Sequence, residues 1–533
     1  MPYTTNIGAA GDSAAHELTH ATLRLLSDAF PLALAVALGG LLARWLRRRG
    51  LHWSWSLTPL PAVLPLAGWL GPIGPGALIA LVVASLRGRR RHLGDLDTGH
   101  DLGRIARERL TPSAVLRRRL PRAGRGASSD AGTRALRLGR DGAGRTVTIP
   151  FAPDAAGHAL VVGATGSGKT VTQTLLAVRA IEQGRGVVAI DPKGDAAMRR
   201  ALGEAAARAG RELIEWTPDG PTPYNPYARG GETEIADRLL AGERFTEPHY
   251  LRQAQRYLGH AIRALRACEA EVSLRTIVEV LEPPAFEQVL RNAPKEQAVV
   301  GHSYLDSLTP RQLRDLAGVR DRLAILAESD VGRWLDADRA RPGFDLLDAV
   351  RRRSVVYFGL EADSRPLLAQ MLGAAIVQDL QSTVAALQAE PTAALVVIDE
   401  FAAVSAEHVV ALFGRARSAG ISLLLGTQEI ADLRLPGRER TLEQVMGNLS
   451  LLIAHRQVVP ASAELVARLS GARGAWRVSR STGGRMTRTR TVEPCIAPEQ
   501  LTGLARGCAA VIPFGSGDRT CIAHVELTGG ERR

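Results

Sequence analysis

The stretch GATGSGKTVTQTLL, residues 163 to 176, decides the fold of this 533-residue chain. Its first eight residues satisfy the pattern G-x-x-x-x-G-K-[ST], and they follow an apolar stretch and precede one with helical periodicity. Glycines at such a turn let backbone N–H groups close around phosphate oxygens, and the helix N-terminus adds its positive dipole. We therefore predict a phosphate-binding loop made of Gly163, Ala164, Thr165, Gly166, Ser167, Gly168, Lys169 and Thr170.

The lysine of this loop is informative because the chain has 67 basic side chains, of which only Lys169, Lys193 and Lys295 are lysines. A compact ammonium group reaches between the β- and γ-phosphates of a nucleotide inside a tight loop, whereas a planar guanidinium is broader and makes different contacts. With lysine this scarce, a chance match to the pattern is rare. We predict that Lys169 binds the phosphates of ATP.

A second acidic site is required for phosphoryl transfer, and the stretch ALVVIDEF supplies it at the end of a predicted buried strand. We expect Asp399 to hold Mg²⁺ together with Thr170, directly or through water, and Glu400 to polarise the attacking water. Gln428 ends the next apolar stretch, ISLLLGTQ, where a polar side chain can reach the γ-phosphate and position water. An ordinary loop glutamine is the alternative for Gln428.

The chain around these motifs alternates between short apolar strands and helices, which indicates an α/β fold with a parallel sheet covered on both faces. The alternation stops between about Gly231 and Arg341, where the periodicity is mainly helical. We predict an ATPase domain in two parts, residues 145–230 and 342–525, with an all-α insertion at 231–341 and a C-terminal tail at 526–533.

The N-terminal part differs in character from the rest. After a tail at 1–28, two uncharged stretches, Ala29–Ala43 and Gly50–Leu86, predict a membrane segment at 29–86 with two transmembrane helices; a buried helical hairpin is the alternative. Arginine clusters follow both stretches, so the topology stays open. Residues 87–144 form a basic juxtamembrane linker, with 12 arginines against four acidic residues between Arg87 and Arg125. Attraction to anionic lipid headgroups is the favoured role for this charge, ahead of DNA contact.

The overall charge of +13 indicates a polyanionic partner, either nucleic acid or an anionic membrane surface. The four cysteines show neither C-x-x-C pairing nor the spacing of a metal site, which is typical of free thiols in a reducing cytosol.

Five motifs together resemble the conjugative type IV coupling proteins of the TraG/TraD type, which carry a TraM-recognition domain, within the superfamily of FtsK-like and HerA-like DNA pumps. They are GATGSGKT, AIDPKGD at 189 to 195, YNPY at 224 to 227, VVIDEF ending at Phe401, and GTQ at 426 to 428. The resemblance covers roughly residues 145 to 525 and includes the position of the helical insertion.

The resemblance implies a RecA-like P-loop ATPase domain, a homo-hexameric ring with ATP at subunit interfaces, and DNA held through its phosphate backbone in the centre. It places Arg417 at the family's arginine finger, which reaches the γ-phosphate of a neighbouring subunit, with Arg415 as the second choice. It implies a relaxase or relaxosome and type IV secretion components as partners. This sequence ends without the long acidic tail of some coupling proteins, which leaves cargo recognition to the insertion.

We therefore expect an ATPase at the cell (inner or plasma) membrane, its ATPase domain in the cytoplasm, that delivers DNA with bound relaxase to a type IV secretion channel. Two alternatives stay open. One is an FtsK- or HerA-like DNA translocase outside conjugation, and the other is a membrane docking receptor for secreted protein effectors in which nucleotide only stabilises the ring.

Overall fold

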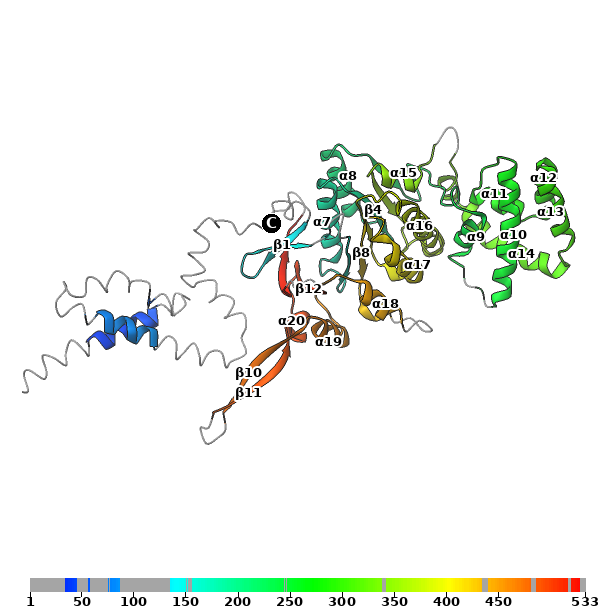
Figure 1. Ribbon diagram of the computed structural model, residues 1–533. Helices are drawn as coiled ribbons and strands as arrows, with labels where there is room; N and C mark the ends of the chain where they lie inside the picture. Colours follow the sequence, from blue (N-terminus) through cyan, green and yellow to red (C-terminus); the bar gives the residue numbers. More distant parts are fainter. Residues whose placement is uncertain are drawn as a thin grey trace, which may run out of the picture. The chain divides into compact units, whose positions relative to one another are not determined.

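The computed structural model (Figure 1) describes the chain as two compact units, one comprising residues 1–127 with 474–491 and the other comprising 128–473 with 492–533. The described residues are 34–45, 56–57, 75, 77–86, 135–149, 151, 156–243, 245, 247–337, 342–433, 440–480, 486–515 and 519–527. All of the predicted phosphate-loop, acidic, glutamine and arginine site residues belong to the second unit.

The second unit is built on one large sheet. Its strands are β1 (Leu136–Asp141), β2 (Thr146–Ile149), β3 (His158–Val162), β4 (Gly186–Asp191), β5 (Leu213–Trp216), β6 (Val355–Gly359), β7 (Ala394–Ile398), β8 (Ile421–Thr427), β9 (Leu451–Ala454), β12 (Cys508–Pro513) and β13 (Cys521–Val525). The 11 strands lie in the order β2-β1-β13-β12-β9-β3-β8-β7-β4-β6-β5. The seven strands from β9 to β5 run parallel to one another.

The prediction of an α/β fold is confirmed, but the expectation of a purely parallel sheet is wrong. The strands β12, β13, β1 and β2 pair antiparallel beyond β9, so the sheet is mixed. Antiparallel strands can be joined by tight turns, and the Asp141 carboxylate stabilises one by accepting hydrogen bonds from the N–H groups of Ala143 (2.9 Å) and Arg145 (2.8 Å). Because β1 begins at Leu136, the sheet starts before the predicted boundary at residue 145.

Helices cover both faces of the sheet, as its apolar strands require (Figure 1). Alternate residues of β3 point to opposite faces, so that Ala159 and Val161 belong to the core that contains α7 (Lys169–Glu182) and α8 (Ala196–Arg208). Leu160 and Val162 belong instead to the larger core that contains α16 (Pro366–Leu387) and α17 (Phe401–Ala416). The central strands are therefore buried on both sides, and polar side chains are confined mainly to the strand ends.

A group of helices separates β5 from β6 in the chain. It comprises α9 (Glu232–Leu240), α10 (Pro248–Ala267), α11 (Leu274–Val280), α12 (Pro283–Asn292), α13 (Lys295–Asp306) and α14 (Pro310–Ala327), and η2 (Gly332–Trp334) and α15 (Leu346–Arg351) lead back to the sheet. Prolines at the first turns of α10, α12 and α14 start these helices with a preset φ, and Thr309 caps α14 by accepting a hydrogen bond from the Gln312 N–H. Helix α10 buries Ala254, Leu258, Ala261 and Leu265, whose spacing of three to four residues is the helical periodicity of this region of the sequence.

The C-terminal third of the second unit also contains η3 (Ile430–Leu433), α18 (Thr441–Asn448), α19 (Pro460–Leu469) and α20 (Pro498–Thr502). The strands β10 (Ala472–Arg480) and β11 (Met486–Pro494) form a two-stranded sheet of their own, most of which belongs to the first unit.

The predicted membrane segment at 29–86 is described only in part. Residues 34–45 and 77–86 are helical, and the Ser56 and Ser85 hydroxyls lie 2.8 Å apart in a hydrogen bond. Among the described residues, no helix combines the length and the apolar character needed to cross a bilayer. The predicted tail at 1–28, residues 87–134 of the predicted linker, and residues 528–533 lie outside the described residues.

Candidate functional site

The predicted phosphate loop joins the carboxyl end of β3 to α7. Its start is fixed to the neighbouring chain segments because the N–H groups of Gly163 and Ala164 donate to the carbonyls of Thr427 (3.4 Å) and Arg456 (3.1 Å). Gly166 and Gly168 have φ values of 74° and 107°, in the left-handed region that favours glycine.

The backbone of this loop offers donors to an anion. Among the described residues, the N–H groups of Gly166, Gly168, Lys169 and Thr170 have no hydrogen-bond partner. The Ser167 hydroxyl is buried and also lacks one in that part of the chain. Unsatisfied donors at a helix N-terminus are the features that bind phosphate.

The acidic residues, which follow β7, meet this loop at the carboxyl-end edge of the sheet, with β8 between β3 and β7. The Lys169 Nζ atom lies 3.1 Å from Asp399 Oδ1 and also contacts Glu400 Oε1. The Thr170 hydroxyl donates to Asp399 Oδ2 over 3.2 Å. The two motifs that the sequence predicted to share a nucleotide therefore lie together, with Thr170 and Asp399 oxygens side by side.

Glu400 occupies an unusual backbone conformation. Its φ of 42° and ψ of 45° are left-handed, and it is the N-cap residue directly before α17. A non-glycine residue in this region carries a cost on the order of 1–3 kcal/mol, which is typical of functional sites. Burial alone would raise the pKa of Glu400, but hydrogen bonds and charges from Lys169 and Lys193, with a further hydrogen bond from Gln428, hold this pKa below its usual range. The carboxylate is therefore ionised at neutral pH.

Gln428 bridges the phosphate loop and the acidic pair. Its Oε1 atom accepts a hydrogen bond of 3.1 Å from the Thr165 hydroxyl, and its side chain lies close enough to Glu400 to help lower the pKa of that carboxyl. Because β8 lies between β3 and β7, a side chain that follows β8 is placed between the phosphate loop and the acids. The structure thus brings Gln428 to the site that the sequence predicted for it.

Arg417 lies at the opposite edge of the sheet from the phosphate loop of its own chain. It follows α17, donates a hydrogen bond of 2.9 Å to the Asn448 carbonyl, and lies near His158, the first residue of β3. Burial and then the charge of Arg417 lower the pKa of His158 to about 4. Arg415, the second choice, is in the last turn of the same helix. A contact between Arg417 and a neighbouring subunit's nucleotide stays a prediction.

Two further side chains lie at this site, and the sequence analysis gave neither of them a role. Lys193, in the DPKGD stretch after β4, places its Nζ atom 3.0 Å from Glu400 Oε1. Gln173 is fully buried on α7, and neither its amide nitrogen nor its amide oxygen has a hydrogen-bond partner among the described residues. The DPKGD stretch at a strand edge and the rarity of lysine predict a contact of Lys193 near the nucleotide, without a catalytic role. Gln173 gave no signal, because a helical glutamine is ordinarily exposed.

His455 packs against the phosphate loop, and the sequence analysis did not identify it. Its Nδ1 atom lies 3.1 Å from the Cys508 carbonyl, which can only accept, so Nδ1 carries the proton and Nε2 accepts from the Thr172 hydroxyl at 2.8 Å. Burial lowers the pKa of His455 to about 4, and the charge of Lys169 acts in the same direction. A Cβ atom at Gly163 would lie 2.5 Å from His455 Cβ, so this packing requires glycine.

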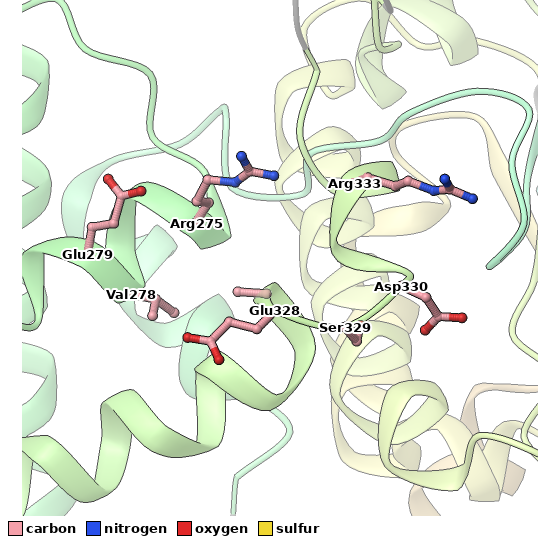
Figure 2. Close-up of a pocket in the computed structure, with 8 residues that line it drawn as sticks. Arg275, Val278, Glu279, Glu328, Ser329, Asp330 and Arg333 are labelled. Atoms are coloured by element: carbon pink, nitrogen blue, oxygen red, sulfur yellow. The ribbon is translucent and has the colours of Figure 1, made fainter.

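A separate cavity of about 520 Å³ lies among the helices between β5 and β6. Figure 2 shows Arg275 and Glu279 on one wall, with Glu328, Asp330 and Arg333 lining the rest, so charges of both signs face it. None of the predicted site residues lines this cavity.

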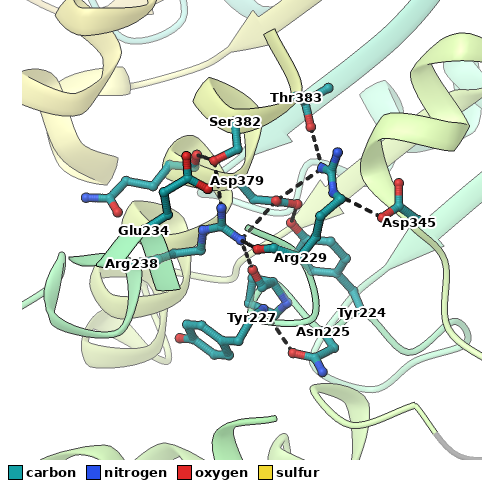
Figure 3. A network of polar contacts seen from close by, with 12 residues as sticks. Tyr224, Asn225, Tyr227, Arg229, Glu234, Arg238, Asp345, Asp379, Ser382 and Thr383 are labelled. Atoms are coloured by element: carbon teal, nitrogen blue, oxygen red, sulfur yellow. Dashed lines mark hydrogen bonds and ion pairs between the residues drawn. The ribbon is translucent and has the colours of Figure 1, made fainter. Parts of the chain in front are cut away.

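The YNPY motif joins a buried polar network instead of the nucleotide site (Figure 3). The Tyr224 hydroxyl donates to Asp379 Oδ2 over 2.7 Å, and Arg238 and Arg229 lie 3.1 and 3.3 Å from Asp379 Oδ1. Burial raises the pKa of Asp379, against the lowering effect of both arginines. Since Arg238 is on α9 and Asp379 on α16, this motif connects the helical region to the sheet's covering helix.

The fold and the site together define a P-loop NTPase. Comparison with known proteins shows which families of these NTPases the chain resembles. The family model described as "TraM recognition site of TraD and TraG" matches residues 393–506, and the model "Helicase HerA-like C-terminal" matches residues 137–219. Over these two segments the chain is therefore similar to the TraG/TraD coupling proteins and to HerA-like ATPases.

Solved structures share the fold. The conjugative coupling protein TrwB lacking its N-terminal part, in its unbound form, has a TM-score of 0.55 at 17% identity and covers 75% of this chain and 91% of its own. TrwB in complex with ADP and Mg²⁺ has a TM-score of 0.53 at 17% identity, over 74% and 90%. VirB4 of Thermoanaerobacter pseudethanolicus has a TM-score of 0.51 at 16% identity, over 74% and 97%.

One curated relative also matches. An uncharacterised protein of Mycoplasma pneumoniae is 32% identical over 104 residues, which are 19% of this chain and 69% of the relative.

Proposed function

We propose that this chain is a membrane-anchored, ATP-hydrolysing DNA translocase that delivers DNA, with its bound relaxase, to a type IV secretion channel. One observation carries the enzymatic part of the proposal. Four neighbouring strands, in the order β3-β8-β7-β4, are each followed in the chain by residues of one polar cluster: Lys169, Gln428, Asp399 with Glu400, and Lys193. Ligands of parallel sheets bind at this edge.

The residues present fit a nucleotide with Mg²⁺. The free N–H groups of the loop and the Lys169 ammonium would hold the phosphates, and the oxygens of Thr170 and Asp399 would hold the metal. The described residues contain no group of three or more histidine, cysteine or acidic side chains suited to a metal, and Mg²⁺ in NTPases needs only one or two protein carboxylates beside the phosphates. Bound Mg²⁺ supplies neutralisation of phosphate charge.

Each residue of the chain at this site then has its own role in ATP hydrolysis. Lys169 exchanges its two carboxylate partners for phosphate oxygens, which is a change of partner with no change of charge. Glu400, kept ionised, accepts a hydrogen bond from the attacking water and polarises it. Gln428, linked to both Thr165 and Glu400, orients that water. Arg417 acts on the nucleotide of a neighbouring subunit in a homo-hexameric ring.

The delivery role is supported by the family and by charge. The model for TraM recognition in TraD and TraG covers the segment with Asp399, Glu400 and Gln428, which favours a relaxosome partner. The net charge of +13 suits a path that holds DNA phosphates without reading bases. The uncharged stretches within residues 29–86 would anchor the chain in the membrane.

The decisive experiment measures ATP hydrolysis by the full-length chain in detergent, alone and with single-stranded or duplex DNA. Stimulation by DNA, with loss of turnover and of ATP binding in Lys169→Ala, is the expected result. A rate of ATP hydrolysis that DNA does not change would favour the docking receptor. Stimulation by DNA in a protein that binds no relaxase or secretion component would favour a translocase outside conjugation. Normal hydrolysis by Lys169→Ala would refute the site.

A further inference from the structure

Two of the chain's three lysines meet at one carboxylate oxygen. Both Lys169 and Lys193 contact Oε1 of Glu400, the latter at 3.0 Å. The two lysines come from different loops, one after β3 and one after β4, and Glu400 follows β7. In a chain that otherwise uses arginine, two compact ammonium groups are placed where both can share a single oxygen, which two broad guanidinium groups do less readily.

The loop that carries Lys193 is held firmly. Asp191, buried at the end of β4, accepts hydrogen bonds from the N–H groups of Lys193 (3.0 Å) and Asp195 (2.5 Å) and from the Tyr357 hydroxyl (2.8 Å). Gly194 has a φ of 71°, and Asp195 caps α8 through the Ala197 N–H. These contacts fix the backbone of Lys193, so its side chain reaches Glu400 from a backbone position that is held in place.

We propose that Lys193 is a positioning residue that retains the Glu400 carboxylate when Lys169 turns to the phosphates; this inference rests on the proposed ATPase function. Before nucleotide binds, Glu400 holds both ammonium groups. A phosphate-bound Lys169 can no longer hold Glu400, and Lys193 is then the cation left on Oε1. It keeps the carboxylate directed at the site, and by sharing the oxygen it also eases the departure of Lys169.

An ordinary surface ion pair does not account for this arrangement. The Lys193 side chain is 41% exposed, but its partner Glu400 is only 12% exposed and is the residue expected to activate water. Solvent screening makes the pair weak as a source of stability. Its consequence is therefore expected in turnover and nucleotide affinity, and not in the stability of the fold.

The test compares full-length Lys193→Met, which keeps the length of the side chain without its charge, with Lys193→Arg and with the matched control Lys295→Met at the start of α13. Turnover number, KM for ATP, and affinity for a fluorescent ADP in the absence of Mg²⁺ are measured for each. Lys193→Met should lower kcat by about 10- to 100-fold. It should weaken ADP binding by about 3- to 10-fold, the size of a partly exposed ion pair.

Lys193→Arg should recover part of both losses, and Lys295→Met should match the unsubstituted chain. The inference also requires a double-mutant cycle with Glu400→Gln, in which adding Lys193→Met should no longer change ADP affinity. An unchanged kcat in Lys193→Met, or an equal loss of affinity with and without the Glu400 carboxylate, would overturn the inference. Absence of ATP hydrolysis in the unsubstituted chain would instead overturn the proposed function.

Discussion

Gly426→Ala should damage the site although it adds only one methyl group to a strand. Gly426 is in β8, beside Val161 of β3, and its backbone is extended, so alanine meets no conformational barrier there. A Cβ atom at this position would lie 2.5 Å from Asp399 Oδ1 and 2.6 Å from Gln173 Nε2. Ordinary contacts begin near 3.4 Å, so the carboxylate or the strand must move by nearly an ångström.

The size of the effect follows from that displacement. Forcing a methyl group into a packed interior costs about 1–3 kcal/mol of stability. A shift of about 1 Å in a group that positions the reaction can lower the rate by on the order of 10²-fold. Because Asp399 is the expected metal ligand, we expect a lower kcat and a higher Mg²⁺ concentration for half-maximal turnover, with a modestly lower midpoint of urea unfolding.

Gly414→Ala is the matched control, since a Cβ atom at this position in α17 would have nothing within 4 Å. It should leave kcat and Mg²⁺ dependence unchanged and raise stability by about 0.5–1 kcal/mol, the preference of a helix for alanine over glycine. The assays are ATP hydrolysis over a Mg²⁺ titration and urea unfolding followed by circular dichroism. Normal Mg²⁺ dependence and kcat in Gly426→Ala would refute the close packing of Asp399 and Gln173 as the basis of the site.

Three further predictions follow from the same structure. Glu400→Gln should bind ATP with little loss but trap it unhydrolysed, and rapid turnover in a single-turnover assay would exclude Glu400 as the base. Arg417→Ala should lower turnover by about 10³-fold or more, as loss of an arginine finger does, and mixing it with Lys169→Ala should restore some activity; no rescue in rings of matched assembly would argue against action between subunits. The free energy of unfolding should fall as pH falls from about 6.5 to 4, because His158 and His455 have folded-state pKa values of about 4 and bind protons more readily when unfolded. Each histidine contributes up to about 3 kcal/mol to this decrease. A free energy of unfolding that stays constant over this pH range would contradict the burial of both histidines as neutral groups.

Local sequence was enough to predict the phosphate loop. The pattern from Gly163 to Thr170 depends on residues adjacent in the chain, and the shape of the loop follows from the backbone conformations that its glycines allow. The roles expected of Asp399, Glu400 and Gln428 were likewise predicted from their positions directly after apolar strands. Their expected neighbourhood followed from a general property of parallel sheets, in which all carboxyl ends lie at one edge.

What the sequence determined by itself is therefore the chemistry of the residues after the central strands, together with the α/β class of the fold. Only the tertiary structure decided the strand order, which places β4 beside β7 and so brings Lys193 to Glu400, 207 residues away. It also decided the antiparallel extension through β12 and β13, the support of the loop by His455, and the position of Arg417 at the far edge. These features depend on which strands pair and which side chains fill the core, and such choices are made by contacts between distant segments that no local pattern records.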